Sequence, residues 1–171
     1  KKVYLELNKI LRNKNSIIVS GGNTIKNLLK KYKHKILCRK ILLSDERLVK
    51  KHSNLRNDKF FEKLIKKNIL NSRQLINFTH ESFNKKKINN FSNKISKLKF
   101  DYAILSLGVN GHFASIFELN KNNIDFYYIN NSPKFPKERV TVSLDKISKC
   151  KKIFFFAERK NKKKKITNFD K

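Results

Sequence analysis

The stretch S-I-I-V-S-G-G-N-T-I-K-N-L-L-K-K-Y, residues 16–32, predicts the local geometry from which the fold can be worked out. Residues 16–20 form a short run rich in β-branched side chains, which is typical of a buried strand. Two glycines follow, and the apolar residues after them recur at helical spacing up to Tyr32. The stretch therefore predicts a strand, a glycine turn and a helix.

The same alternation continues along the chain. We expect further strands at 36–43, 74–79, 101–107, 124–129, 139–144 and 152–157. Helices are expected at 3–12, at 53–70 with Ser53 as N-cap, at 81–98 and from about Phe113, and the tail from Arg159 is expected to be a basic helix or a frayed end. This alternation predicts an α/β fold with a three-layer, mostly parallel, Rossmann-like sheet and helices on both faces. Neither a linker nor a repeat divides residues 1–171, so we expect one domain.

The composition is strongly basic. Among 171 residues, 42 are Lys or Arg and 13 are Asp or Glu, which gives a formal net charge of +29. Such a charge suggests nucleic acid as a partner, but only where the lysines concentrate on one face. Here they are spread from Lys1 to Lys171 among Asn and Ile, residues that AT-rich codons favour together. We therefore attribute the charge first to compositional bias and regard nucleic-acid binding as the less favoured alternative.

Other features narrow the class of protein. A 39% share of hydrophobic residues, with 14 Phe, is enough to build a core. No apolar run approaches the length of about 18 residues that a membrane span needs, so no membrane association is expected. Cys38 and Cys150 show no metal-ligand spacing, and no secretory segment is visible, which together predict no metal and a cytoplasmic location.

Glycine and proline are scarce, and their positions are informative. The four glycines fall in two clusters, Gly21-Gly22 and Gly108 with Gly111, and both prolines lie in S-P-K-F-P-K-E-R, residues 132–139. Glycine is required where φ is positive or where a ligand approaches the backbone. One such cluster would indicate only a tight turn, whereas two clusters and a proline segment together indicate a binding site.

In open α/β sheets, ligands bind beyond the carboxyl ends of the strands. The first of these ends carries the residues Ser20, Gly21, Gly22, Asn23 and Thr24. This turn opens a helix, so its amides and the helix dipole favour an anion such as phosphate. It is neither a Walker A motif nor a dinucleotide fingerprint. The next strand ends at Asp45-Glu46-Arg47, where Arg47 suits phosphate and Asp45 or Glu46 either orients Arg47 or binds a substrate hydroxyl.

A third strand end carries a histidine. Of the four histidines, only His112 lies between a glycine and an apolar segment at a strand's carboxyl end, in L-G-V-N-G-H. An imidazole with a pKa near neutrality suits general-base catalysis. The alternative is a structural histidine that caps a short helix. We favour catalysis because the neighbouring strand ends also carry features of a site.

Four motifs occur in order between Ser20 and Leu144: S-G-G-N-T-I, then D-E-R-L-V followed by S-N, then L-G-V-N-G-H-F-A-S-I-F, then S-P-K-F-P-K-E-R-V-T. In combination they resemble the 6-phosphogluconolactonase family, whose fold is shared with glucosamine-6-phosphate deaminase and ribose-5-phosphate isomerase. The resemblance implies hydrolysis of 6-phosphoglucono-δ-lactone to 6-phosphogluconate in the oxidative pentose phosphate pathway. It also implies a small sugar-phosphate lactone as the partner and no cofactor.

The resemblance also implies roles for individual residues. His112 would be the base that activates water, and Asn110 stands where the family usually has an Asp that orients this histidine. Gly108 and Gly111 would let the backbone approach the sugar ring. The groups implied to hold the phosphate are the 20–24 turn, Arg47, Lys134 and Arg139. The family runs longer at both ends, so we expect a chain truncated relative to it.

Three alternatives stay open from the sequence. The first is a sugar-phosphate isomerase or deaminase on the same fold, against which the segment 132–139 argues. The second is a basic nucleic-acid-binding protein, which predicts strongly salt-sensitive binding. The third is an inactive relative, suggested by Asn110 in place of Asp.

Overall fold

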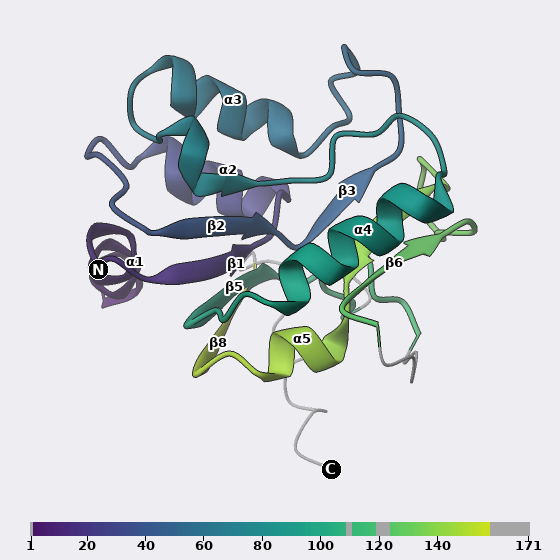
Figure 1. The fold of residues 1–171 in the computed structure, drawn as a ribbon. Coiled ribbons are helices and arrows are strands. Elements are labelled where there is room, and N and C mark those ends of the chain that lie inside the picture. Colours follow the sequence, from purple (N-terminus) through teal and green to yellow (C-terminus); the bar gives the residue numbers. More distant parts are fainter. Residues whose placement is uncertain (1, 109–110, 119–123, 158–171) are drawn as a thin grey trace.

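The computed structural model describes residues 2–108, 111–118 and 124–157. Within them a five-stranded parallel sheet forms the centre, in the order β4-β2-β1-β5-β8 (Figure 1). Its strands are β1 (Ser16–Val19), β2 (Lys40–Leu43), β4 (Leu75–Ile76), β5 (Tyr102–Ser106) and β8 (Lys152–Phe156). Val19 is in register with Leu43 on one side and with Ile104 on the other. The carboxyl ends of β1, β2 and β5 therefore finish close to one level.

A second, antiparallel sheet adjoins this edge. It consists of β3 (Asp45–Arg47), β7 (Arg139–Val142) and β6 (Phe126–Ile129), in the order β3-β7-β6. Only Ser44 separates β2 from β3, so the chain passes directly from the central sheet into the smaller one. The register places Arg47 opposite Arg139 and Asp45 opposite Thr141.

Helices cover both faces of the central sheet (Figure 1). On one face, α1 (Lys2–Arg12), α2 (Asn23–Lys30) and α3 (Asp58–Lys66) bury Leu7, Ile25 and Phe61 in a shared core. On the other face, α4 (Lys85–Ser96), α5 (Leu144–Ser148) and the small sheet bury Ile88 and Ile147 in a second core. Side chains alternate between these cores along β1, because successive residues of a strand point to opposite faces. The predicted three-layer α/β fold is confirmed.

The helix expected at 53–70 is shorter than predicted and begins at Asp58. Ser53 is not its N-cap, because the Ser53 hydroxyl accepts a hydrogen bond from the Leu55 amide within a turn, at 3.2 Å. The amides at the true helix start are bound by the distant Glu46 carboxylate instead, which no local pattern could indicate.

In the described residues 113–118 the helix expected from Phe113 is absent, and that prediction was wrong. Phe113 instead forms isolated antiparallel bridges with Leu107 and with Ile116, and Ala114 between them has a positive φ of 51°. The apolar residues of this segment pack into the core as a compact turn rather than as a helix face. This turn brings the segment that contains His112 back towards the end of β5.

Other boundaries also differ from expectation. The strand expected at 36–43 begins at Lys40. The strand expected at 74–79 is reduced to β4, which follows the short 3-10 turn η1 (Ser72–Gln74). The helix expected at 81–98 begins after Asn84, which caps it. The segments 124–129 and 139–144 form strands, but of the antiparallel sheet, and α5 was not expected. The tail from Arg159 lies outside the described residues. No helix in the described ranges is both long enough and apolar enough to span a membrane.

We expect Ile18→Ala to lower the free energy of unfolding by about 2–5 kcal/mol, because it leaves a cavity between β1 and the α4 side of the sheet. Ile18 is fully buried, at 0% exposure. The matched control is Ile153→Ala on the edge strand β8, where Ile153 is 36% exposed and a loss below about 1 kcal/mol is expected. Urea unfolding of both variants measures the difference, and equal losses would contradict this account of the core.

Candidate active site

The turn at Gly21 and Gly22 lies between Asn57, which precedes α3, and Ser106, the last residue of β5. A Cβ on Gly21 would lie 2.4 Å from the Asn57 Cβ, and a Cβ on Gly22 would lie 2.7 Å from the Ser106 Oγ. Both distances are shorter than real Cβ contacts allow. At Gly21 the close contact with the Asn57 Cβ requires glycine, and the turn after β1 thereby packs directly on the start of α3 and the end of β5.

The same turn starts α2, whose first residues are Asn23 and Thr24. Gly22 is the N-cap and supplies no side-chain hydrogen bond to the helix. The first amides of a helix lack intrahelical partners and lie at the positive end of its dipole. This end of α2 is thus able to receive an anion, as the sequence predicted.

Ser20 connects neighbouring strands through the hydroxyl group of its side chain. Its side chain is buried, its hydroxyl lies 3.3 Å from the Ser44 hydroxyl, and it accepts a hydrogen bond from the Ser106 amide at 3.3 Å. These contacts join the ends of β1, β2 and β5. The structure therefore gives Ser20 a role in the shape of the turn.

Asp45 is buried, and its polar atoms are engaged within the protein. Its carboxylate accepts hydrogen bonds from the hydroxyls of Ser44, at 3.1 Å, and Ser115, at 2.8 Å. Its backbone carbonyl accepts a hydrogen bond from the Asn57 side-chain amide at 3.0 Å. Asp45 thereby connects β3 to the segment after β5 and to the start of α3.

Arg139 holds the proline segment in shape. Its guanidinium donates to the carbonyls of Pro136 at 3.0 Å, Lys134 at 3.2 Å and Phe135 at 3.3 Å, and to the Ser115 hydroxyl at 3.4 Å. Only 5% of Arg139 is exposed. Most of its donors are thus used within the protein, and its geometry fits support of the loop that carries Lys134 better than direct contact with phosphate.

Arg47 stands directly opposite Arg139 across the β3–β7 pair. Burial lowers the pKa of Arg139, and the nearby positive charge of Arg47 lowers it further. One Arg47 terminal nitrogen donates to the Leu55 carbonyl, whereas its buried Nε has no hydrogen-bond partner among the described residues. Two adjacent guanidinium groups repel each other, and a bound anion would relieve that repulsion. Arg47 is therefore the stronger candidate for phosphate.

Lys26 of α2 is a cation that sequence reasoning missed. Burial, followed by the nearby charge of Arg47, lowers the pKa of Lys26. Its position one turn into the helix that the glycine turn opens was the only available signal. Lys26 adds a third positive charge close to Arg47 and the α2 amides.

His112 lies beside Gly108 at the end of β5. A Cβ on Gly108 would stand 2.0 Å from the His112 Cε1, so only glycine leaves room for this ring. The Gly108 amide donates to the His112 carbonyl at 2.6 Å, and Gly111, with a positive φ of 85°, donates back to the Gly108 carbonyl at 3.1 Å. The two glycines thus form the tight loop that positions His112. Asn110 lies outside the described residues.

An aromatic ring links His112 to the arginine side of the site. The His112 ring stacks on Phe117 with 4.8 Å between ring centroids, and the Arg139 guanidinium lies 6.0 Å from the centroid of the same Phe117 ring. The histidine and the arginine pair are therefore on one side of the same sheet edge. Sequence reasoning missed Phe117 because an apolar residue in F-A-S-I-F gave no sign of contact with a polar site.

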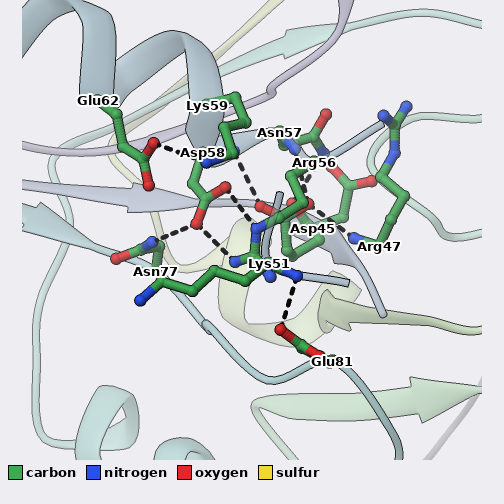
Figure 2. A network of polar contacts seen from close by, with 11 residues as sticks. Asp45, Arg47, Lys51, Arg56, Asn57, Asp58, Lys59, Glu62, Asn77 and Glu81 are labelled. Atoms are coloured by element: carbon green, nitrogen blue, oxygen red, sulfur yellow. Dashed lines mark hydrogen bonds and ion pairs between the residues drawn. The ribbon is translucent and has the colours of Figure 1, made fainter. Parts of the chain in front are cut away.

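Glu46, which the sequence left without a definite role, is 1% exposed and accepts three backbone hydrogen bonds. They come from the amides of Arg47 at 2.8 Å, Asn57 at 2.7 Å and Asp58 at 2.9 Å. Burial, with a smaller contribution from the charge of Asp58, raises the pKa of Glu46 to about 7, although the three amide hydrogen bonds oppose this rise. Figure 2 shows Arg47, Asn57 and Asp58, the three residues whose amides bind Glu46.

The described part of the chain offers no metal site. No group of three or more His, Cys, Asp or Glu side chains within it is placed to hold a metal ion. Cys38 and Cys150 are both buried thiols, and burial raises the pKa of each.

Comparison with known proteins identifies the family of the chain. The family model described as glucosamine-6-phosphate isomerases/6-phosphogluconolactonase matches residues 1–171. The chain belongs to this family. A family member from Borreliella burgdorferi, a 6-phosphogluconolactonase, is 29% identical over 169 residues, which cover 90% of this chain and 72% of the relative.

Solved structures of the family show the same fold. The 6-phosphogluconolactonase from Thermotoga maritima is similar with a TM-score of 0.72 and 24% identity, over 90% of this chain and 75% of the other. That from Trypanosoma cruzi gives a TM-score of 0.74 at 22% identity, over 91% and 74% of the two chains. The fold predicted from the motifs is thus found in both.

We expect Gly108→Ala to displace the His112 ring without unfolding the protein, because the obstructed atoms are the end of a rotatable side chain. The chemical shifts of the ring should change in NMR spectra, while far-UV circular dichroism stays that of the wild type. Gly111→Ala is the control: an added Cβ there meets no atom within 4 Å, but the positive φ should cost about 1–2 kcal/mol of stability. Unchanged His112 signals in Gly108→Ala would contradict the packing described.

Glu46 should make stability pH-dependent. Because its pKa is about 7 in the folded protein and 4.5 ordinarily, the folded state binds the proton more tightly, and stability falls as pH rises between these values. The expected loss is up to about 3 kcal/mol. Urea unfolding near pH 5 and pH 8 measures it, and Glu46→Gln should flatten the dependence. An identical pH dependence in the variant would refute this assignment.

Proposed function

We propose that the chain hydrolyses 6-phosphoglucono-δ-lactone to 6-phosphogluconate. The observation that carries this proposal is the placement of His112 at the end of β5, on the same sheet edge as Arg47 and the first turn of α2. The chain belongs to a family that includes 6-phosphogluconolactonases, and this membership supports the choice of substrate. A base at one strand end and a cationic site at the neighbouring ones suit a molecule with a phosphate at one end and a reactive carbonyl at the other.

In the proposed mechanism, the phosphate is bound by the α2 amides and by Arg47, with Lys26 and Lys134 adding positive charge. Fixing this remote dianion places the lactone carbon near His112, and such positioning accounts for much of the rate of enzymatic reactions. The binding energy of a non-reacting group is thereby used to orient the reacting one.

The neutral imidazole of His112 accepts a proton from water as the water oxygen bonds to the lactone carbonyl carbon. The resulting tetrahedral intermediate collapses, and the bond between that carbon and the ring oxygen breaks. The imidazolium returns its proton to the departing ring oxygen, which becomes a hydroxyl. The new carboxylic acid then loses a proton to solvent and leaves as the carboxylate.

The roles of the other candidate site residues are also proposals. Asn110 would stand next to His112 and orient it through its side chain, less strongly than an Asp would. Arg139 would act on the substrate through the loop that it holds rather than by contact. Ser20 and Asp45 would likewise fix the shape of the site.

We expect His112→Ala to lower kcat for 6-phosphoglucono-δ-lactone by about 10²–10⁴-fold with a smaller change in KM, because a general base contributes an effect of this size. The assay follows proton release from freshly formed lactone, corrected for spontaneous hydrolysis. His80→Ala is the control, since His80 contacts Phe78 and Lys87, which have no role in the proposed mechanism.

Glucosamine 6-phosphate should be offered in parallel, because the family also contains isomerases of that substrate. Turnover of the amino sugar without lactone hydrolysis would overturn the proposed function. Full lactonase activity in His112→Ala would overturn the role of the histidine alone.

A further inference from the structure

The segment between β3 and α3, residues 48–57, has no regular secondary structure, yet it supplies two contacts to the proposed phosphate site. The Leu55 carbonyl accepts a hydrogen bond from the Arg47 guanidinium. The Asn57 side chain packs against Gly21. A group that fixes the conformation of residues 48–57 therefore also fixes the positions of Arg47 and of the Gly21-Gly22 turn.

A single carboxylate closes the segment at both of its ends. One Glu46 oxygen accepts hydrogen bonds from the Arg47 amide before the segment and from the Asn57 amide at its end, and the other accepts one from the Asp58 amide. Because Glu46 is almost fully buried, water does not compete for these bonds. A carboxylate that accepts several backbone amides in this way is a strong constraint on the chain.

A buried ion pair between Arg56 and Asp58 lies at the start of α3, next to the amides that Glu46 binds. Asp58 accepts two hydrogen bonds from the Arg56 guanidinium, at 2.8 and 2.6 Å, and one from the Asn77 amide at 2.9 Å (Figure 2). Arg56 and Asp58 are each 2% exposed. The start of α3 is thus anchored to β4, and Glu46 ties the 48–57 segment to this anchored point.

We propose that Glu46 is a positioning residue for the phosphate site: by binding both ends of the 48–57 segment, it holds Arg47 and the Gly21-Gly22 turn in the geometry that binds the phosphate of the substrate. This inference rests on the proposed function. Glu46 does not touch the substrate and acts through Arg47 and Asn57. A glutamine in its place would keep one acceptor oxygen but would turn an N–H group towards the amides of the clamp.

The test compares 6-phosphoglucono-δ-lactone with the unphosphorylated glucono-δ-lactone. For Glu46→Gln, the preference for the phosphorylated lactone, taken as the ratio of the two kcat/KM values, should fall by about 10- to 100-fold, an effect typical of a binding group displaced by about 1 Å. The loss should lie mainly in KM for the phosphorylated lactone. An equal loss for both lactones, or an unchanged preference, would overturn the proposal.

A double-mutant cycle with Arg47→Ala shows whether Glu46 acts through the arginine. In the Arg47→Ala background, Glu46→Gln should lower the preference by less than about twofold more. Additive losses would refute the coupling. The matched control is Glu62→Gln, a half-exposed glutamate of α3 paired with Lys59 at 3.1 Å, which should leave the preference unchanged.

A second variant keeps the proposal testable where Glu46→Gln does not fold. Asn57→Ala removes the amide group that packs against Gly21 and donates to the Asp45 carbonyl, and it leaves no buried charge unpaired. It should lower the same preference, and a wild-type preference in a folded Asn57→Ala protein would overturn the proposal. A wild-type protein that turns over neither lactone would overturn the proposed function instead.

Discussion

The site depends on the close contact of the Gly21-Gly22 turn with Asn57 on one side and Ser106 on the other. The parallel register of β1, β2 and β5 brings their carboxyl ends to one level, but only a turn without side chains lets the following loops meet there. This contact leaves the amides of α2, Arg47 and the His112 loop along one edge. A larger residue at either glycine would separate them.

Buried polar groups maintain this edge at an electrostatic cost. Arg47 and Arg139 face each other across two strands, and the carboxylates of Asp45 and Glu46 beside them offset part of the repulsion. The cost is visible at Glu46, where burial disfavours the charged carboxylate and raises its pKa to about 7 in spite of three amide donors. A protein selected for stability alone would not need such an arrangement, whereas the proposed site for a dianion would use it.

The sequence predicted the central sheet because residues 16–20 and 101–107 carry local signals of strands. The combination of glycine and proline motifs also indicated His112, Arg47 and the glycine turn as candidate site residues, and their roles in binding and catalysis stay proposals. The sequence did not predict that α3 begins at Asp58, because this start is fixed by Glu46 binding amides 11 and 12 residues away. Nor did it predict that β3 belongs to a second sheet, because β3 pairs with β7, a segment far from it in the sequence. Arg139 was expected to bind phosphate, and its geometry became visible only with the loop carbonyls in place. The net charge of +29 does not by itself identify a binding partner, and nucleic-acid binding stays an alternative prediction from the sequence.

A crystal structure of the protein with bound 6-phosphogluconate tests the central claim most directly. The account predicts the phosphate on the first amides of α2 and the Arg47 guanidinium, with the product carboxylate beside the His112 ring. A phosphate bound elsewhere on the basic surface, or a carboxylate out of reach of His112, would contradict it.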